Sequence, residues 1–147
     1  MQTKTIKKTI TIPAPKEKVW DVLINDKFLR IWYSEFGEGV YAETDWKVGS
    51  KAVFKDKAGE GLVSKVIQNK PNELLSMEFQ GIIVKGKEDY ESEIARAVKG
   101  GKEIYQLKEQ GGATQLAIET DMEESMYDSM SEAWDNALVE IKELSSK

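Results

Sequence analysis

The chain has 147 residues, 40% of them hydrophobic and 32% charged, with a formal net charge of -5 and neither cysteine nor histidine. This composition is typical of one globular domain, here over residues 1–147, and it excludes disulfides, cysteine redox motifs, the usual serine or cysteine triads and most zinc sites. Basic residues are scattered among the acids, and no apolar run has the length of a signal-peptide core or a membrane span, so we expect a cytoplasmic protein that does not bind nucleic acid.

The first predicted element is a strand over residues 4–12, where isoleucines fall on one parity and threonines and lysines on the other. Pro15 can begin a helix after this strand, because the backbone N–H of the first helical residue makes no hydrogen bond within the helix and proline lacks that N–H. Apolar residues recur at helical spacing over residues 19–24. Asp26 can cap a second short helix that ends near Trp32.

After this point the apolar pattern changes to period two. The predicted strands cover residues 40–44, 50–55, 61–69, 74–80, 102–109 and 114–122. Their connections are short and rich in glycine and asparagine, which favours an antiparallel sheet. The segment between Gly81 and Gly101 fits no single element. We expect a solvated loop with a helical turn there, or alternatively a lid over a binding site.

The last predicted element is a long helix over residues 125–144. Ser125 and Asp128 form a sequence like a capping box. The apolar stripe of the helix comprises Met126, Met130, Ala133, Trp134, Ala137, Leu138, Ile141 and Leu144. Packing this stripe onto the apolar face of the sheet buries both surfaces. The prediction is an α+β fold: a curved seven-stranded antiparallel sheet around a long C-terminal helix, with two short helices after the first strand.

Several short stretches carry a resemblance to known proteins. They are ITIPAP at 10–15, VWDVL at 19–23, DWKVGS at 45–50, residues 61–71, GATQL at 112–116, and Trp134 with Ala137 and Leu138. With the order of the elements, they resemble the helix-grip fold of the START-like (SRPBCC) superfamily, which includes birch-pollen-allergen-like proteins, polyketide cyclases and lipid-transfer domains. Within it the chain is most similar to the Aha-type branch, named for the C-terminal domain of the heat-shock chaperone ATPase activators.

This resemblance implies a cavity between sheet and helix that takes a small apolar or amphipathic ligand. It also implies an alternative, a stress-response protein that binds a chaperone through its surface. The activators carry a separate N-terminal domain for which this chain has no room, which argues against a full activator role. A third alternative is catalysis of the cyclase or isomerase type, because some relatives carry out such chemistry in this cavity.

The candidate site combines the inward parity of the sheet with the helix stripe. The predicted lining residues are Trp32, Phe54, Leu75, Met77, Phe79, Tyr105, Leu107, Leu116, Ile118, Met126, Met130, Trp134 and Ala137. Tyr105 is the best candidate for a placed polar group, and Ser64 is a second one. Ordinary core packing predicts the same positions, since apolar residues fill a core as readily as they line a cavity.

Acid–base chemistry could use aspartate, glutamate, tyrosine or lysine. No inward-pointing carboxylate pair stands out. Glu78 and Glu119 alternate with the apolar residues of their predicted strands, so their side chains are expected on the opposite, solvated face. We therefore expect a binding protein and not an enzyme, with no catalytic residues, metal or cofactor. Its expected partners are the small ligand and, in the alternative, a chaperone, and its expected state is a monomer or homodimer.

Overall fold

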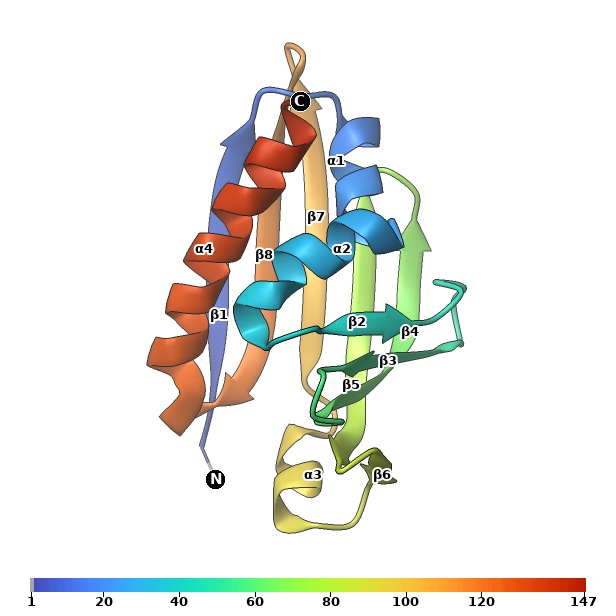
Figure 1. Ribbon diagram of the computed structural model, residues 1–147. Coiled ribbons are helices and arrows are strands. Elements are labelled where there is room, and N and C mark those ends of the chain that lie inside the picture. Colours follow the sequence, from blue (N-terminus) through green and yellow to red (C-terminus); the bar gives the residue numbers. More distant parts are fainter. Residues whose placement is uncertain (1) are drawn as a thin grey trace.

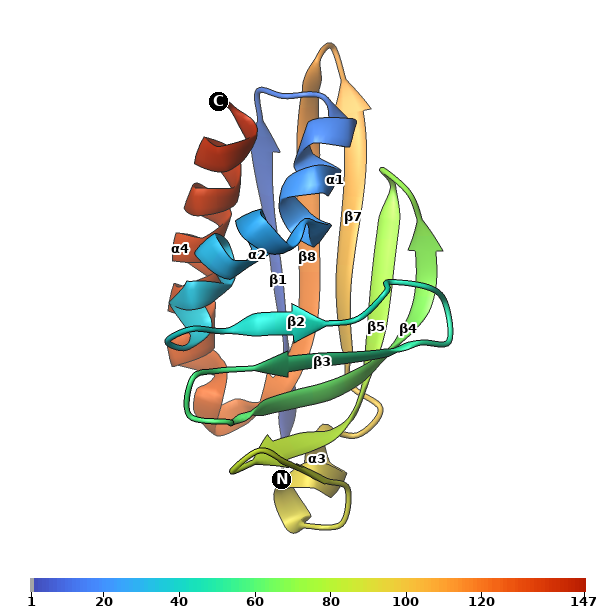
Figure 2. The same ribbon diagram turned by 45° about the vertical axis from the view of Figure 1, so that its right-hand side comes forward.

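The computed structural model describes residues 2–147, which form an eight-stranded sheet in the order β1-β8-β7-β5-β4-β3-β2, with β6 paired to β5 outside this path. The strands are β1 (Thr3–Ile12), β2 (Tyr41–Glu43), β3 (Lys51–Lys55), β4 (Gly61–Lys70), β5 (Leu74–Val84), β6 (Lys87–Asp89), β7 (Lys102–Gln110) and β8 (Ala113–Glu123). All seven strand pairings are antiparallel. Figure 2 shows β2 and β3 running across the long strands, so the sheet is strongly curved.

The helices lie mostly on one face of this sheet, and one short helix lies at its end. They are α1 (Lys16–Ile24), α2 (Asp26–Trp32), the 3-10 helix η1 (Tyr33–Phe36), α3 (Glu93–Val98), the 3-10 helix η2 (Glu124–Met126) and α4 (Tyr127–Ser145). The long helix α4 lies along β1, with α1 and α2 beside it (Figure 1). The predicted α+β helix-grip architecture is thus confirmed. Within residues 2–147, none of these helices combines the length and the apolar character needed to cross a membrane.

The second short helix forms where the sequence predicts it, but its cap is a different residue. The side-chain oxygen of Asn25 accepts a hydrogen bond from the backbone N–H of Lys27 at 3.3 Å, so Asn25 is the N-cap. Asp26 lies inside the first turn instead, where it forms an ion pair with Arg30 at 2.8 Å. The prediction that Asp26 caps this helix is therefore wrong by one position.

The start of α4 also differs from the prediction. No side chain caps this helix, and its N-cap position is Met126. The hydroxyl of Ser125 donates to the carboxylate of Glu123 instead of to the helix N-terminus. The capping box predicted from Ser125 and Asp128 is wrong, because η2 separates the end of β8 from the first turn of α4.

The eighth strand comes from the segment that the sequence left unassigned, so the prediction of seven strands is wrong by one. β5 continues past Gly81 and turns at Lys85 and Gly86, whose φ angles of 52° and 78° suit a tight hairpin turn. The chain returns as β6 and enters α3, where the side chain of Ser92 accepts from the backbone N–H of Ala95. The helical turn predicted in this segment corresponds to α3, at the end of the sheet in Figure 1.

Candidate functional site

A buried carboxylate lies on the inner face of the sheet. Glu103 is 5% exposed, and it occupies the same parity of β7 as Tyr105 and Leu107. Its cross-strand partners are Met77 on β5 and Thr120 on β8, both of which are buried. The period of two residues along a strand thus places Glu103 between the sheet and the helices.

Two tyrosine hydroxyls hold this carboxylate. The hydroxyl of Tyr33, from η1, donates to Glu103 Oε2 at 3.0 Å, and the hydroxyl of Tyr105 donates to the same oxygen. η1 is positioned by the preceding residue, since the indole N–H of Trp32 donates to the carbonyl of Val22 at 2.9 Å and ties α2 to α1. We call Tyr33, Glu103 and Tyr105 the interior triad.

The electrostatics of the interior triad follow from its burial. Burial raises the pKa of Glu103 above its ordinary value, although the hydrogen bonds from Tyr105 and Tyr33 oppose this shift. Burial and the neighbouring carboxylate raise the pKa of both tyrosines well above their ordinary value, so both remain protonated donors. None of the ion pairs within residues 2–147 includes Glu103.

Aromatic rings surround the interior triad. The aromatic cluster consists of Trp32, Tyr33, Phe36, Trp46, Phe54, Tyr105 and Trp134, with centroid separations of 4.8 to 6.3 Å between neighbouring rings. The ring of Tyr33 is stacked on that of Phe54 at 5.2 Å, and the ring of Phe36 meets Trp134 edge-on at 4.8 Å. The single carboxylate of the triad therefore lies beside a cluster of aromatic rings contributed by the sheet, the β2–β3 connection, α2, η1 and α4.

The structure brings most of the predicted lining residues together in one buried group. Ten of them belong to it: Trp32, Phe54, Leu75, Met77, Tyr105, Leu107, Leu116, Ile118, Trp134 and Ala137. Met130 is half-buried and packs against this group, while Phe79 is buried outside it, next to Gly101. Ser64 is buried, and its hydroxyl has no hydrogen-bond partner among residues 2–147. Whether these side chains line a ligand site remains a prediction.

Met126 lies outside the interior, and its predicted place in the lining is wrong. It is 45% exposed, because η2 turns the chain away from the end of β8 before α4 begins. The buried face of α4 starts only at Trp134.

Two members of the interior triad were missed by the sequence analysis. Glu103 had a usable signal, since it lies two residues before Tyr105 and shares its parity. Tyr33 had no such signal, because its position depends on how η1 continues from α2. The predicted polar groups, Tyr105 and Ser64, do both lie in the interior.

The outer face of the sheet carries two open grooves. One, of about 420 Å³, lies over β1, β8 and β7 and is bordered by Lys7 and Glu119, which form an ion pair at 3.6 Å. The other, of about 700 Å³, lies near the β7–β8 hairpin and is bordered by Lys16, Glu73 and Lys108. Charges of both signs line these grooves, so neither has the apolar character that a small-molecule site usually requires.

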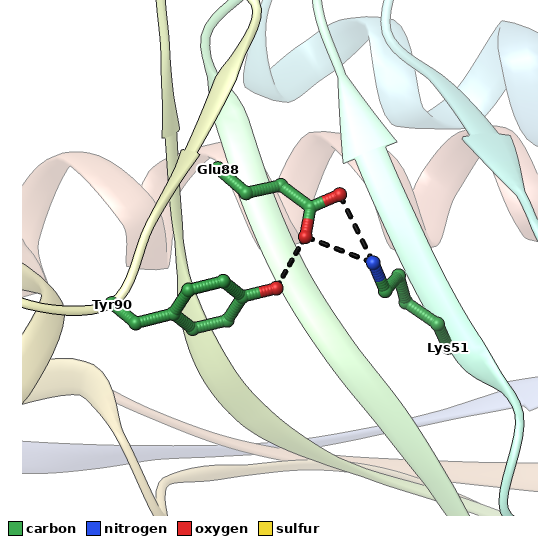
Figure 3. Close-up of polar contacts among 3 residues, drawn as sticks. All are labelled: Lys51, Glu88 and Tyr90. Atoms are coloured by element: carbon green, nitrogen blue, oxygen red, sulfur yellow. Dashed lines mark hydrogen bonds and ion pairs between the residues drawn. The ribbon is translucent and has the colours of Figure 1, made fainter.

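A polar cluster on the outer face holds β6 in place (Figure 3). Lys51 Nζ lies 2.9 and 3.1 Å from the two carboxylate oxygens of Glu88, to which the hydroxyl of Tyr90 also donates. The hydrogen bonds from Tyr90 and Lys51 hold the pKa of Glu88 below its ordinary value. The ring of Tyr90 lies over Gly81, where a Cβ would be 2.8 Å from it. Tyr90 is 41% exposed, so the cluster is solvated, and its contacts tie the β5–β6 hairpin to β3.

Replacing Glu103 with glutamine is expected to change how stability depends on pH. Because the pKa of Glu103 is raised by folding, the folded protein holds this proton more tightly than the unfolded chain does. The wild type therefore loses stability as the pH rises from the unfolded pKa of Glu103 through its folded pKa, whereas glutamine cannot ionise. Urea denaturation between about pH 4 and about pH 8 should show Glu103→Gln gaining stability relative to wild type as the pH rises. A difference that stays constant with pH would contradict this.

The curved antiparallel sheet around α4 defines the class of protein: a helix-grip domain of the START-like superfamily. More particularly, the chain belongs to the family described as activator of Hsp90 ATPase homolog 1-like protein, which it matches over residues 13–146. Comparison with curated protein sequences finds no match.

Solved structures share this fold at low sequence identity. A protein from Mesorhizobium loti is 16% identical, with 96% of each chain covered and a TM-score of 0.76. A protein from Arthrobacter aurescens is 16% identical, with 97% of this chain and 86% of the other covered and a TM-score of 0.75. The Aha1 dimer from Colwellia psychrerythraea is 19% identical, with 97% and 96% covered and a TM-score of 0.69. At these identities the likeness concerns the fold.

Proposed function

We propose that the protein binds a small apolar or amphipathic molecule between the sheet and α4, and that the interior triad orients it. The observation that carries this proposal is the carboxylate of Glu103, buried with two tyrosine hydroxyls in a mostly apolar and aromatic interior. A charged group in such a place costs stability, and an apolar residue of similar size would pack there without that cost. Small-molecule sites have this character: mostly apolar, with few polar groups at fixed positions.

We propose that a ligand enters the interior between η1 and α4. Phe36 on η1 and Met130 on α4 are half-buried and pack against the buried group, whereas Trp32 and Trp134 behind them are fully covered. Because Met is flexible and Phe36 makes an edge contact with Trp134, both can turn aside without breaking a backbone hydrogen bond. A ligand that enters here meets the aromatic cluster first and the interior triad behind it.

We propose binding and not catalysis as the role of the interior triad. Both tyrosine hydroxyls already donate to the same carboxylate oxygen, and both are held protonated by their surroundings. A general acid or base works best when its pKa lies near the working pH, which is not the case for these tyrosines. The geometry therefore favours a fixed polar anchor.

Ligand binding is expected to disappear when the interior is filled. Ala137 is fully buried on α4, and Ala137→Phe should place a ring in the space that the ligand uses. Titration with an environment-sensitive hydrophobic dye, followed through tryptophan fluorescence, should show saturable binding to the wild type and none to the variant. Val139→Phe is the matched control, because Val139 is 51% exposed on the same helix.

Two results together would remove this function and leave the fold intact. The first is that the wild type binds none of a broad set of lipids and aromatic compounds. The second is that Ala137→Phe lowers the free energy of unfolding by about 1–3 kcal/mol, the cost of overpacking a solid core. A binding site would instead accept the ring with only a modest loss of stability.

Association with a chaperone is a second candidate function, supported by the family match over residues 13–146 and by the shared fold with the Aha1 dimer. In this case the surface of the domain, and not its interior, would carry the function. ATPase assays on a purified heat-shock chaperone, with and without the protein, separate the two candidates. Stimulation that Ala137→Phe leaves unchanged would favour the surface.

A further inference from the structure

We propose that the ligand of the interior is an organic cation, an alkyl or aryl ammonium compound whose charge lies between Glu103 and the aromatic cluster. This inference rests on the proposed function and names the chemical class of its ligand. It follows from two properties of the interior: a buried carboxyl group without a cationic partner within residues 2–147, and a cluster of aromatic rings beside it.

The first property is the missing counter-ion. The chain has 21 lysine and arginine residues, and exposed acids use them, as in the pairs Lys8–Asp135 at 2.7 Å and Lys51–Glu88 at 2.9 Å. Glu103 takes part in no ion pair within residues 2–147. The tyrosine hydroxyls both donate to Oε2 and carry no positive charge, so they provide no counter-charge when Glu103 is ionised. A cation brought by a ligand would supply the compensation that the protein itself does not.

The second property is the aromatic surround. The face of an aromatic ring carries partial negative charge and attracts a cation, most strongly where water is excluded. Tyr33 and Tyr105 reach Glu103 with their hydroxyls, and their rings neighbour those of Phe54, Trp32 and Trp134. An ammonium group near the carboxylate is therefore also near these aromatic rings, so both features can attract the same charge.

The same arrangement disfavours anionic ligands. The carboxylate of a fatty acid would have to lie near Glu103 in a buried space, where like charges repel strongly. The site thus discriminates against anions through repulsion as well as in favour of cations through attraction. A neutral alcohol experiences neither effect, and its binding measures the apolar contribution alone.

Three probes with the same alkyl chain test the inference: octyltrimethylammonium, 1-octanol and octanoate. Each probe is titrated into the protein at concentrations below the critical micelle concentration of the probe. Tryptophan fluorescence or calorimetry gives the Kd. We expect the wild type to bind the ammonium probe at least about tenfold more tightly than octanoate. In Glu103→Gln this preference should fall by about tenfold, while the Kd for octanol stays nearly the same.

The control variant is Glu132→Gln, which removes one carboxylate from the exposed face of α4 and should leave all three affinities unchanged. If Glu103→Gln does not fold, the wild type alone decides: its affinity for the ammonium probe should rise with pH as Glu103 ionises, while both tyrosines that contact Glu103 stay protonated.

The outcomes separate this inference from the proposed function. Equal binding of all three probes to the wild type, with no effect of Glu103→Gln or of pH, would contradict the inference that the ligand is a cation. It would leave the proposed binding function intact. Tighter binding of octanoate than of the ammonium probe would overturn it as well. If none of the probes binds, and the hydrophobic dye does not bind either, the proposed function falls together with the inference.

Discussion

Replacing Gly61 with alanine is expected to lower the free energy of unfolding by about 3 kcal/mol or more. A Cβ at Gly61 would lie 1.7 Å from the carbonyl oxygen of Phe54 and 2.8 Å from its carbonyl carbon. Both atoms belong to the backbone of β3, which pairs with β4 through Lys55 and Gly61, so neither strand can move without breaking the ladder. Urea denaturation followed by circular dichroism measures the loss.

Gly86→Ala is the control for this substitution. Gly86 has a φ of 78°, but a Cβ there would have no atom within 4 Å, so the cost is the left-handed backbone alone, about 1–2 kcal/mol. Gly61→Ala should therefore be clearly the less stable of the two variants. If the two unfold at the same urea concentration, β3 and β4 are not held as closely at this point as the structure places them.

Truncating Ile141 to alanine is expected to destabilise the protein by about 2–5 kcal/mol. Ile141 is fully buried on α4, within the group that joins this helix to α1 and the sheet. Removing its side chain leaves a cavity that the surrounding residues close only in part. Thermal and urea denaturation should both show the loss.

The matched control lies two residues away on the same helix. Val139 is 51% exposed, and Val139→Ala should change stability by no more than about 0.5 kcal/mol, since alanine has the higher helix propensity. Equal effects at the two positions would mean that α4 does not pack through Ile141, which would contradict the helix-grip arrangement.

Much of this fold could be predicted because several strands, such as β7 and β8, have one buried and one more exposed face. Tyr105 and Leu107 on β7 alternate with more exposed residues, as do Leu116 and Ile118 on β8, and all four are buried as predicted. The stripe of α4 follows the same logic at helical spacing, and its members from Trp134 onward face the sheet. When one face of an element is buried, apolar residues recur along the sequence at the spacing of that element, and the fold class can be predicted from this spacing.

Features that depend on tertiary contacts could not be predicted in this way. Gly81 ended the predicted strand, but β5 continues through it because the ring of Tyr90 covers the position that lacks a side chain. Glu103 conflicted with the rule that charged residues face water, although its parity placed it inside. The contact from Tyr33 to Glu103 joins residues far apart in the sequence, and no local pattern specifies it.

The position of β1 at the edge of the sheet, beside β8, has a consequence for how the protein is made. Ile12 pairs with Thr114 and Thr3 with Glu123, so β1 leaves the ribosome well before the strand with which it pairs. Contacts between such distant segments slow folding, because a long loop must close before they form. Until β8 is synthesised, β1 has no neighbouring strand, and its side chains Ile6 and Ile12, which are buried in the folded protein, remain exposed to solvent. Until β8 is available, β1 is therefore exposed to aggregation or to capture by chaperones.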